Sequence, residues 1–247
     1  MILIFGSTHD DVSYFEDQLK NKATEKIFGK YDLLTGTMFN QNVGIIYGGF
    51  TNYISAAIVS RIIAKNYVVL VINVGKGSAY GDGLKNGDAV ISRQVYLGEV
   101  NQTGIQDAIL GQIPRCPQSF VVDPYILETL NNSLNKVVRK NNTKIGTYVS
   151  VEKVLHSPKD LEGITSSSGV IFGHKEDVIV DSVTGGIALA CYLNDTPFIS
   201  IEIVERHIGE ESTVNSLINV INRYSEIGKA VTSFIGEITS NSVIGGK

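Results

Sequence analysis

The stretch VVLVINVGKGSAYGDGLKNGDAVIS, residues Val68–Ser92, decides the fold class of this chain. Its apolar, β-branched run Val68–Asn73 is too short for an independent helix and is typical of a strand buried on both faces in a parallel or mixed sheet. The glycine-rich segment Gly75–Ser78 then predicts a tight turn, and a second strand is predicted over Ala89–Leu97. Because ligands of open α/β sheets bind beyond the carboxyl ends of strands, Gly75–Ser78 is a candidate ligand site. The alternative is a turn that only joins two strands.

Strand and helix patterns alternate along most of the remaining chain. Apolar runs predict further strands at Ile2–Phe5, Val43–Tyr47, Lys144–Ser150, Val178–Val180 and Pro197–Val204. Apolar residues at helical spacing predict helices near Val12–Leu19, Tyr53–Ala64, Pro124–Lys140, Ile187–Leu193 and Thr213–Glu237. This alternation indicates an α/β fold with a mixed central β-sheet flanked by helices on both faces. We expect a single domain over residues 1–238 and a C-terminal tail at 239–247.

Two further segments predict a hairpin and a loop. Lys26–Phe39 predicts a β-hairpin whose turn lies near Gly36 or at Asn40–Asn42. The serine-rich patch Thr165–Gly169 is typical of a loop. Both interruptions leave the alternation of strands and helices intact on either side of them.

Composition limits the classes of function. The chain has 247 residues and no linker-like segment, which favours one domain over two. Its net charge of −4 argues against a nucleic-acid partner, and the lack of an apolar run of about 18 residues argues against a membrane span. The two cysteines, Cys116 and Cys191, lack metal-type spacing, and the N-terminus is typical of a strand and not of a signal peptide. We therefore expect a cytoplasmic protein that needs no metal and no cofactor.

Several short segments occur in an order and spacing that resemble the nucleoside phosphorylase/nucleosidase superfamily. They are Gly6–Val12, Thr35–Gly36, Ile72–Gly75, Leu84–Asp88, Gly111–Pro117 and Pro197–Ile199. The resemblance runs from Met1 to about residue 235 and is closest to the 5′-methylthioadenosine/S-adenosylhomocysteine nucleosidases. It implies a three-layer α/β fold and hydrolysis of an N-ribosidic bond, with one group acting as an acid toward the purine and carboxylates activating water and holding the ribose.

The resemblance also implies that the catalytic residues are largely replaced. Asp11 falls where the family has its water-activating glutamate, and Val183 falls where the family has its ribose-binding glutamate. The family's Ser-Asp pair, whose aspartate serves as the acid, falls on Glu205 and Arg206. An arginine stays charged at neutral pH and cannot deliver that proton.

Other matching positions have changed character too. Asp181 matches only the first acid of the ribose-binding segment, and Ser182 takes the place of its methionine. Lys76 falls on a serine of the family, and Val154 falls on the aromatic residue that stacks on adenine. We therefore expect the chain to be a poor 5′-methylthioadenosine/S-adenosylhomocysteine nucleosidase.

The candidate site combines these positions with other polar residues that follow predicted strands. Asp11 and Glu205 are the candidate catalytic residues. The candidate ligand-binding residues are His9, Gly75, Lys76, Gly77, Glu152, Val154, Asp181, Ser182, Val183, Glu202 and Arg206. Asp10 and Asp11 also suit the first turn of a helix capped by Ser7 or Thr8, a structural role compatible with ligand binding.

Two hypotheses remain open for function. The chain either cleaves an N-glycosidic bond with other residues, by hydrolysis or phosphorolysis, or is a catalytically inactive homologue that binds a ligand or has a structural role. The positive charges of Lys76 and Arg206 predict an anionic nucleoside-type ligand. Alternatively, Arg206 pairs with Asp11, Asp181 or Glu202 and fills the site.

The resemblance further implies a homodimer in which the partner helps to close the pocket. Gln102–Leu110 matches the family segment that does so. Tyr53, Ile54 and Ile109 could supply apolar contact.

Overall fold

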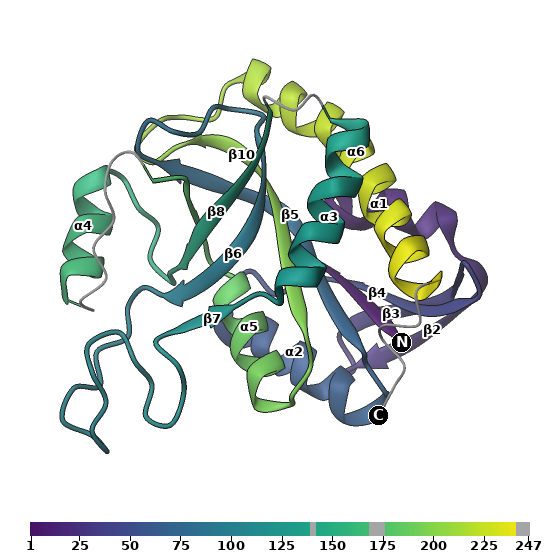
Figure 1. Ribbon diagram of the computed structural model, residues 1–247, viewed down its shortest axis with the longest axis horizontal. Helices are drawn as coiled ribbons and strands as arrows, with labels where there is room; N and C mark the ends of the chain where they lie inside the picture. Colours follow the sequence, from purple (N-terminus) through teal and green to yellow (C-terminus); the bar gives the residue numbers. More distant parts are fainter. Residues whose placement is uncertain (139–141, 168–175, 241–247) are drawn as a thin grey trace.

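A mixed β-sheet of ten strands forms the centre of the computed structural model, which describes residues 1–138, 142–167 and 176–240 (Figure 1). The strands are β1 (Ile2–Gly6), β2 (Lys20–Ile27), β3 (Tyr31–Met38), β4 (Gln41–Tyr47), β5 (Leu70–Tyr80), β6 (Ala89–Leu97), β7 (Ser119–Val121), β8 (Thr143–Ser150), β9 (Val178–Asp181) and β10 (Phe198–His207). The helices are α1 (His9–Gln18), α2 (Asn52–Lys65), α3 (Pro124–Val137), α4 (Pro158–Ser167), α5 (Thr184–Leu193) and α6 (Val214–Ser240). The expected α/β class with a mixed sheet is confirmed.

The strands follow the spatial order β10-β6-β8-β9-β5-β1-β4-β3-β2, with β7 paired to β6. Strand β10 also pairs with β5, so β5, β9, β8, β6 and β10 close a circuit of pairings at one end of the sheet. Strands β1 and β10 run parallel to β5, and β8 runs parallel to β9.

Strand β9 runs antiparallel to the second half of β5, so its carboxyl end at Asp181, and that of β8 beside it, lie near the middle of β5, close to the end of β1. Strand β10 reaches the same part of β5 with Arg206, which pairs with Ser78. The carboxyl ends of these four strands therefore come together around the middle of β5, and carboxyl ends of strands are where ligands of α/β sheets bind.

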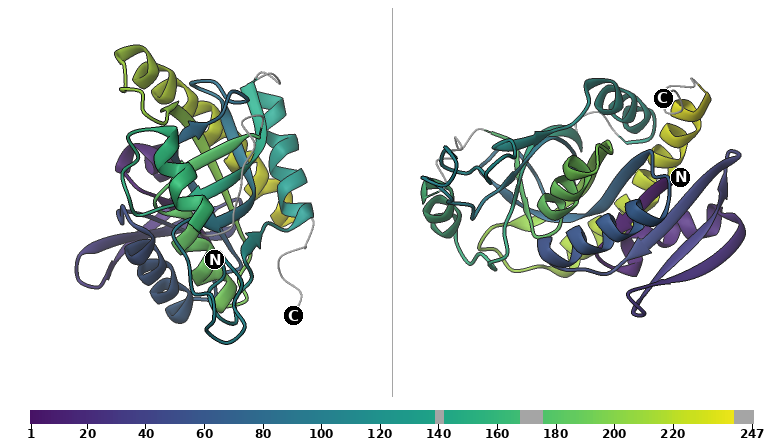
Figure 2. Two further views of the ribbon diagram at one scale, coloured as in Figure 1. Left: turned by 90° about the vertical axis from the view of Figure 1, so that its left-hand side faces the viewer. Right: turned by 90° about the horizontal axis from the view of Figure 1, so that it is seen from below.

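Helices flank both faces of this sheet (Figure 2). Helix α6 contacts α1 and α3, whereas α2 contacts α5. Helix α3 illustrates why these segments are helical, because Asp123 caps its first turn through the amides of Tyr125 and Ile126, and Pro124 occupies a first-turn position. Its apolar residues then recur at helical spacing on the buried face: Ile126, Leu130 and Leu134.

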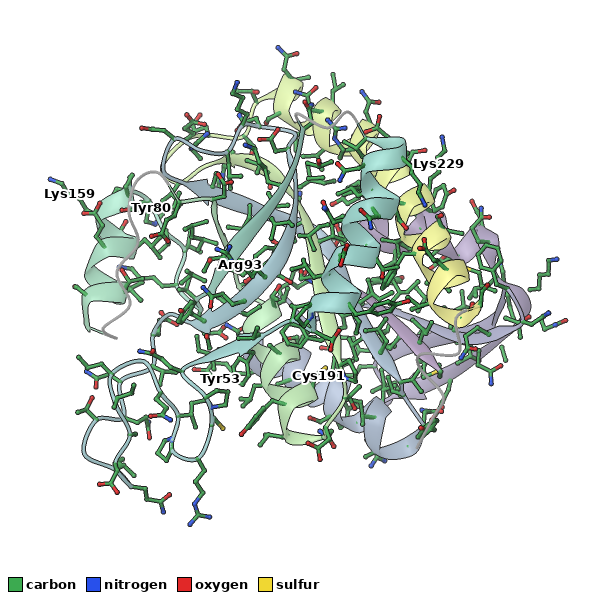
Figure 3. The ribbon with its side chains drawn as sticks, viewed as in Figure 1. Tyr53, Tyr80, Arg93, Lys159, Cys191 and Lys229 are labelled. Atoms are coloured by element: carbon green, nitrogen blue, oxygen red, sulfur yellow. The ribbon has the colours of Figure 1, made fainter. Side chains whose placement is uncertain are left out.

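The sheet and helices enclose a large apolar core. Both cysteines are buried and unpaired, and Cys191 on α5 points into the interior (Figure 3). None of the helices within the described part of the chain is long and apolar enough to cross a membrane.

The glycine-rich segment in the centre of the chain is not a turn, which corrects the prediction for Gly75–Ser78. Strand β5 begins at Leu70 and continues through this segment to Tyr80. A Cβ added at Gly77 would lie 2.6 Å from Oε2 of Glu202 on β10, and one at Gly75 would lie 3.7 Å from Oε1 of the same residue. The absence of a side chain at Gly77 therefore makes room for a buried carboxyl beside β5, whereas a Cβ at Gly75 would be in ordinary contact.

The hairpin at the start of the chain also differs from the prediction. Gly36 lies inside β3 and pairs with Val43 of β4, so it is not the turn. The β3–β4 turn lies at Phe39 and Asn40, whose φ angles are 51° and 60°, so it shares Asn40 with the alternative turn predicted at Asn40–Asn42. Strand β2 precedes them and was not predicted, because its residues are mostly polar and exposed and show no apolar alternation.

The ends of three helices differ from those expected. Thr165–Ser167 ends helix α4 and is not a loop, and residues 168–169 of that prediction lie outside the described residues. Helix α6 continues to Ser240, two residues into the expected tail, and residues 241–247 lie outside the described residues. Helix α3 ends at Val137, and the predicted end at Lys140 also lies outside them.

Candidate functional site

A pocket of about 360 Å³ lies where the carboxyl ends of β1, β8, β9 and β10 come together. Its lining consists of Ser7, Thr8, Asp11, Phe50, Lys76–Ser78, Val151–Leu155, Val180–Val183, Glu205, Arg206 and Ile208. The volume is within the range typical of small-molecule sites, about 300–1,000 Å³. The pocket therefore lies where the topology of an α/β sheet predicts a ligand site.

Asp11 on α1 forms one wall and is 3% exposed. Its Oδ2 accepts a hydrogen bond of 2.7 Å from the amide of Thr8, completing a capping box at the start of the helix. Its Oδ1 accepts a hydrogen bond from the hydroxyl of Tyr224 on α6. Burial raises the pKa of the Tyr224 hydroxyl, and the negative charge of Asp11 raises it further, so this hydroxyl stays a donor. Both carboxylate oxygens of Asp11 thus have protein donors.

Asp181 lies at the end of β9, before α5. Its Oδ2 accepts hydrogen bonds from the amides of Val183 at 3.3 Å and Thr184 at 2.7 Å. Its Oδ1 is buried and receives no hydrogen bond from the described residues. Asp181 therefore holds the start of α5 with one oxygen, and its other oxygen has no donor within the described ranges.

Glu202 on β10 lies beneath the pocket and is 1% exposed. Its Oε1 accepts hydrogen bonds from Nδ2 of Asn73 at 3.1 Å and from Oγ1 of Thr184 at 3.2 Å. Its Oε2 is buried and has no donor among the described residues. Burial raises the pKa of Glu202 well above its ordinary value, and the nearby negative charge of Asp181 raises it further.

The rim of the pocket carries opposite charges. Nζ of Lys76 lies 3.6 Å from Oε2 of Glu205, whose Oε1 accepts a hydrogen bond of 2.8 Å from Ser212. Arg206 donates from Nη1 to the backbone oxygen of Glu210 at 3.1 Å. No carboxylate in the described ranges forms an ion pair with Arg206, so the alternative in which it pairs with Asp11, Asp181 or Glu202 does not hold.

The remaining wall is built by the segment after β8 and the start of α2. Oε1 of Glu152 accepts a hydrogen bond of 2.8 Å from the amide of Asn52, the first residue of α2. The hydroxyl of Ser182 donates to the backbone oxygen of Phe50 at 2.8 Å. The side chains of Phe50 and Val154 are 65% and 67% exposed, so they offer apolar surface to a ligand.

Most residues of the predicted site line this pocket. They are Asp11, Lys76, Gly77, Glu152, Val154, Asp181, Ser182, Val183, Glu205 and Arg206. Three others do not. His9 is exposed on α1, 3.3 Å from Glu16 and in edge contact with Tyr47. Gly75 and Glu202 lie behind the lining.

Sequence analysis missed the residues that hold the acids in place. Tyr224, Asn73 and Thr184 supply donors to the carboxyls, and they come from α6, β5 and α5. The helical pattern around Tyr224 predicted only a buried face, and no local motif links it to Asp11, 213 residues away. A buried asparagine inside an apolar strand, as at Asn73, was the one local signal that a polar partner lies nearby.

The described part of the chain contains no group of three histidine, cysteine or acidic side chains arranged as metal ligands. The chemistry that this pocket offers is that of carboxyls, one lysine, one arginine and a partly apolar wall. Such a set can hold hydroxyl groups and a planar or anionic group of a small molecule.

Comparison with known proteins identifies the family. The model of the phosphorylase superfamily matches residues 1–235. A 5′-methylthioadenosine/S-adenosylhomocysteine nucleosidase of Bacillus pumilus is 25% identical over 214 residues, covering 87% of this chain and 89% of the relative. The corresponding enzyme of Staphylococcus haemolyticus is 27% identical over 238 residues, covering 90% and 100%.

Solved structures show the same fold. The nucleosidase of Neisseria meningitidis, in complex with methylthio-immucillin-A, superposes with a TM-score of 0.83 at 21% identity, covering 96% of this chain and 98% of the other. The nucleosidase of Colwellia psychrerythraea, in complex with adenine, has a TM-score of 0.80 at 20% identity, covering 96% and 94%. With the family model matching nearly the whole chain, this protein belongs to the phosphorylase superfamily.

Proposed function

We propose that this protein binds a nucleoside-type small molecule in the pocket between α1, β9 and β10 and cleaves its N-glycosidic bond. The observation that carries the proposal is the position of this pocket, which lies at the carboxyl ends of strands in a chain of the phosphorylase superfamily. The relatives named above are nucleosidases, and the named structures hold adenine or a nucleoside analogue. Asp11 and Asp181 supply carboxylates for the ribose or for a water molecule.

The proposed ligand carries an anionic group. Arg206 lines the pocket, and its one hydrogen bond among the described residues goes to a backbone oxygen, so further guanidinium donors remain for a ligand. An arginine fork matches a phosphate or carboxylate in two parallel hydrogen bonds. Lys76 contributes less, because Glu205 already lies within ion-pair distance of it.

We expect 5′-methylthioadenosine and S-adenosylhomocysteine to be poor substrates. By the resemblance, Val183 and Arg206 stand where the nucleosidases have a ribose-binding glutamate and the acid for the base. Loss of one general acid or base costs about 10²–10⁴ in rate, and here two groups differ. Adenine release from either compound at about 1 s⁻¹ or faster, a turnover typical of working enzymes, would contradict this expectation.

A panel of nucleosides, nucleotides and sugar phosphates tests the proposal. Each compound is scored by mass spectrometry for cleavage and by thermal shift for binding. Arg206→Ala should weaken binding of the anionic compounds and leave neutral nucleosides unchanged. Arg61→Ala, an exposed arginine on α2 outside the pocket, is the matched control and should change neither.

The second candidate function is ligand binding without turnover. It is favoured by the state of the two candidate catalytic carboxyls. Asp11 already accepts hydrogen bonds from Thr8 and Tyr224, and Glu205 is held by Lys76 and Ser212. A base that is fully hydrogen-bonded within the protein is poorly placed to take a proton from water. Thermal shifts with no cleaved product across the panel would select this candidate.

We also propose that the protein forms a homodimer. Exposed apolar residues gather near the N-terminus of α2 and in the segment between β6 and β7: Phe50, Tyr53, Ile54, Ile105, Ile109 and Leu110. Tyr53 lies on the side from which that segment projects (Figure 3). Light scattering at micromolar concentration should give the mass of a dimer, and Tyr53→Glu should shift it toward a monomer. Tyr67→Glu, at an equally exposed tyrosine (75% against 76%), is the control that should leave the mass unchanged.

A further inference from the structure

The carboxyls of Asp181 and Glu202 share the donors of one residue, Thr184, and each has one oxygen without a donor among the described residues. Thr184 serves both of them, since its amide donates to Oδ2 of Asp181 at 2.7 Å and its hydroxyl donates to Oε1 of Glu202 at 3.2 Å. The outer oxygens, Oδ1 of Asp181 and Oε2 of Glu202, are both buried and both lack a donor among the described residues. The negative charge of Asp181 raises the pKa of Glu202, so the two carboxyls are close neighbours.

The surroundings of Glu202 supply no compensating positive charge. The titratable groups that face it from neighbouring elements are Asp181 at the end of β9, Asp11 of α1, Tyr148 of β8 and Tyr224 of α6. Within the described ranges, neither Glu202 nor Asp181 takes part in an ion pair. Two unpaired negative charges this close and this deeply buried are strongly unfavourable.

We propose that Asp181 and Glu202 form a carboxylic acid–carboxylate pair that holds one proton in common, making the pocket floor a proton-binding site. The proton lies between Oε2 of Glu202 and Oδ1 of Asp181 and satisfies both orphaned oxygens with one hydrogen bond. Gly77, which has no side chain, leaves the space that the carboxyl of Glu202 occupies. The pair carries a single negative charge, and Asp181 presents it to the pocket.

The proton pair has a consequence for stability that can be measured without a ligand. Because the pKa of Glu202 is raised in the folded state, the folded protein binds more protons than the unfolded chain above the ordinary glutamate pKa of 4.5. Stability from this pair is therefore fully present below that pH and is lost as the pH rises through the raised pKa. Within that window a difference of one proton increases the unfolding equilibrium constant about tenfold per pH unit.

Glu202→Gln separates this pair from the other titrating groups. The glutamine amide donates permanently to Oδ1 of Asp181 and so imitates the protonated glutamic acid without titrating. Urea unfolding is measured from about pH 5 to about pH 9 for the wild type and for Glu202→Gln. We expect the wild type to lose stability relative to the variant as the pH rises. Glu205→Gln is the control, since it alters a pocket carboxyl but leaves the pair intact. Its stability should still fall with rising pH relative to that of Glu202→Gln. Parallel profiles for the wild type and Glu202→Gln would overturn the proposal.

Infrared spectroscopy gives a second readout that does not depend on unfolding. The wild type near neutral pH should show the C=O stretching band of a protonated carboxylic acid, and the band should shift in D₂O. It should be absent in Glu202→Gln and in Asp181→Asn, where an amide supplies the donor instead. A wild-type spectrum without the band would overturn the proposal even if one of the variants failed to fold.

The charge of the pair should also affect ligand binding, a step that rests on the proposed anionic ligand. Adenosine 5′-monophosphate is titrated above about pH 7, where its phosphate is already a dianion because the second pKa is about 6. Its affinity for the wild type should fall as the pair loses its proton, and its affinity for Glu202→Gln should stay constant. Equal pH dependence in the two proteins would overturn the link to ligand binding. Absence of binding in both would overturn the proposed nucleotide ligand, while the unfolding and infrared measurements would still decide the proton pair.

Discussion

The two sides of the pocket hold buried carboxyls in opposite ways. On the α1 side, Asp11 is 3% exposed, and each of its oxygens accepts a hydrogen bond, from Thr8 and from Tyr224. On the β10 side, Glu202 is 1% exposed, one of its oxygens has no donor among the residues that the structure describes, and a second acid, Asp181, lies nearby. The two side chains are almost equally buried, so they differ in the number of hydrogen-bond donors that the fold gives them.

The contrast shows what decides the charge of a buried acid. Donors that point at a carboxylate stabilise its ionised form, whereas burial without donors and a neighbouring negative charge stabilise the protonated form. On the α1 side, Thr8 and Tyr224 supply such donors to Asp11. The β10 side lowers its charge by binding a proton. Variants on each side test this difference in donor supply.

The largest effect is expected at the glycine that makes room for Glu202. In Gly77→Ala the new Cβ would meet Oε2 of Glu202 and Cγ2 of Ile179, each at 2.6 Å, and the backbone oxygen of Val180 at 3.1 Å. Overpacking of this kind costs about 1–3 kcal/mol and more where backbone must move, so we expect a loss of about 3 kcal/mol in urea unfolding.

The matched control is Gly75→Ala on the same strand. Its new Cβ would meet Glu202 at 3.7 Å, which is ordinary van der Waals contact. We expect a change below about 1 kcal/mol, the cost of a well-tolerated core substitution. Equal losses at both glycines would mean that the carboxyl of Glu202 does not lie where the β10 side of the comparison requires it.

The second effect concerns the donor on the α1 side. Tyr224→Phe removes the hydroxyl that donates to Asp11 and leaves a buried carboxylate oxygen without a partner. The penalty for such a group is about 1–3 kcal/mol, measured as the free energy of unfolding. Tyr14→Phe on the same α1 side is the control, because no hydrogen bond of its hydroxyl is seen among the described residues, and it should be close to neutral. A neutral Tyr224→Phe would remove the contrast between the two sides.

The two sides of the pocket also differ in how much of them the sequence predicts. The apolar run at Val68–Asn73 predicted a buried central strand because burial on both faces leaves a local pattern, and β5 begins at Leu70 within that run. Asp11 was placed at the pocket because an acid in the first turn after a strand lies at the ligand edge of such a sheet. These are features that a few neighbouring residues determine.

The features that were missed depend on residues far apart in the chain. Closely spaced glycines are more often a turn than a strand, and Gly77 is required by Glu202 of β10 and by Ile179 and Val180 of β9, which are far from it in the sequence. Strand β2 is held by pairing with β3, with little burial of its own, so it carries no apolar pattern. The donor from Tyr224 and the proximity of Asp181 to Glu202 likewise have no local signature.

The smallest effect on stability is expected at the rim of the pocket, where Glu205 is a third carboxyl to compare with Asp11 and Glu202. Glu205 receives a hydrogen bond from Ser212 and lies 3.6 Å from Nζ of Lys76, whose side chain is 36% exposed. Solvent screens this pair, and exposed ion pairs contribute about 0–1 kcal/mol. Lys76→Gln should therefore change the free energy of unfolding by less than about 1 kcal/mol, and the change should shrink further in about 1 M salt, where the screening length is about 3 Å.

Lys26→Gln, which removes the more exposed Lys26–Asp32 pair, is the control and should behave alike. A loss of about 2 kcal/mol or more from Lys76→Gln alone, insensitive to salt, would show that Glu205 depends on Lys76 as Asp11 depends on Tyr224. The rim would then belong with the α1 side, as a carboxylate kept ionised by a donor that the fold supplies.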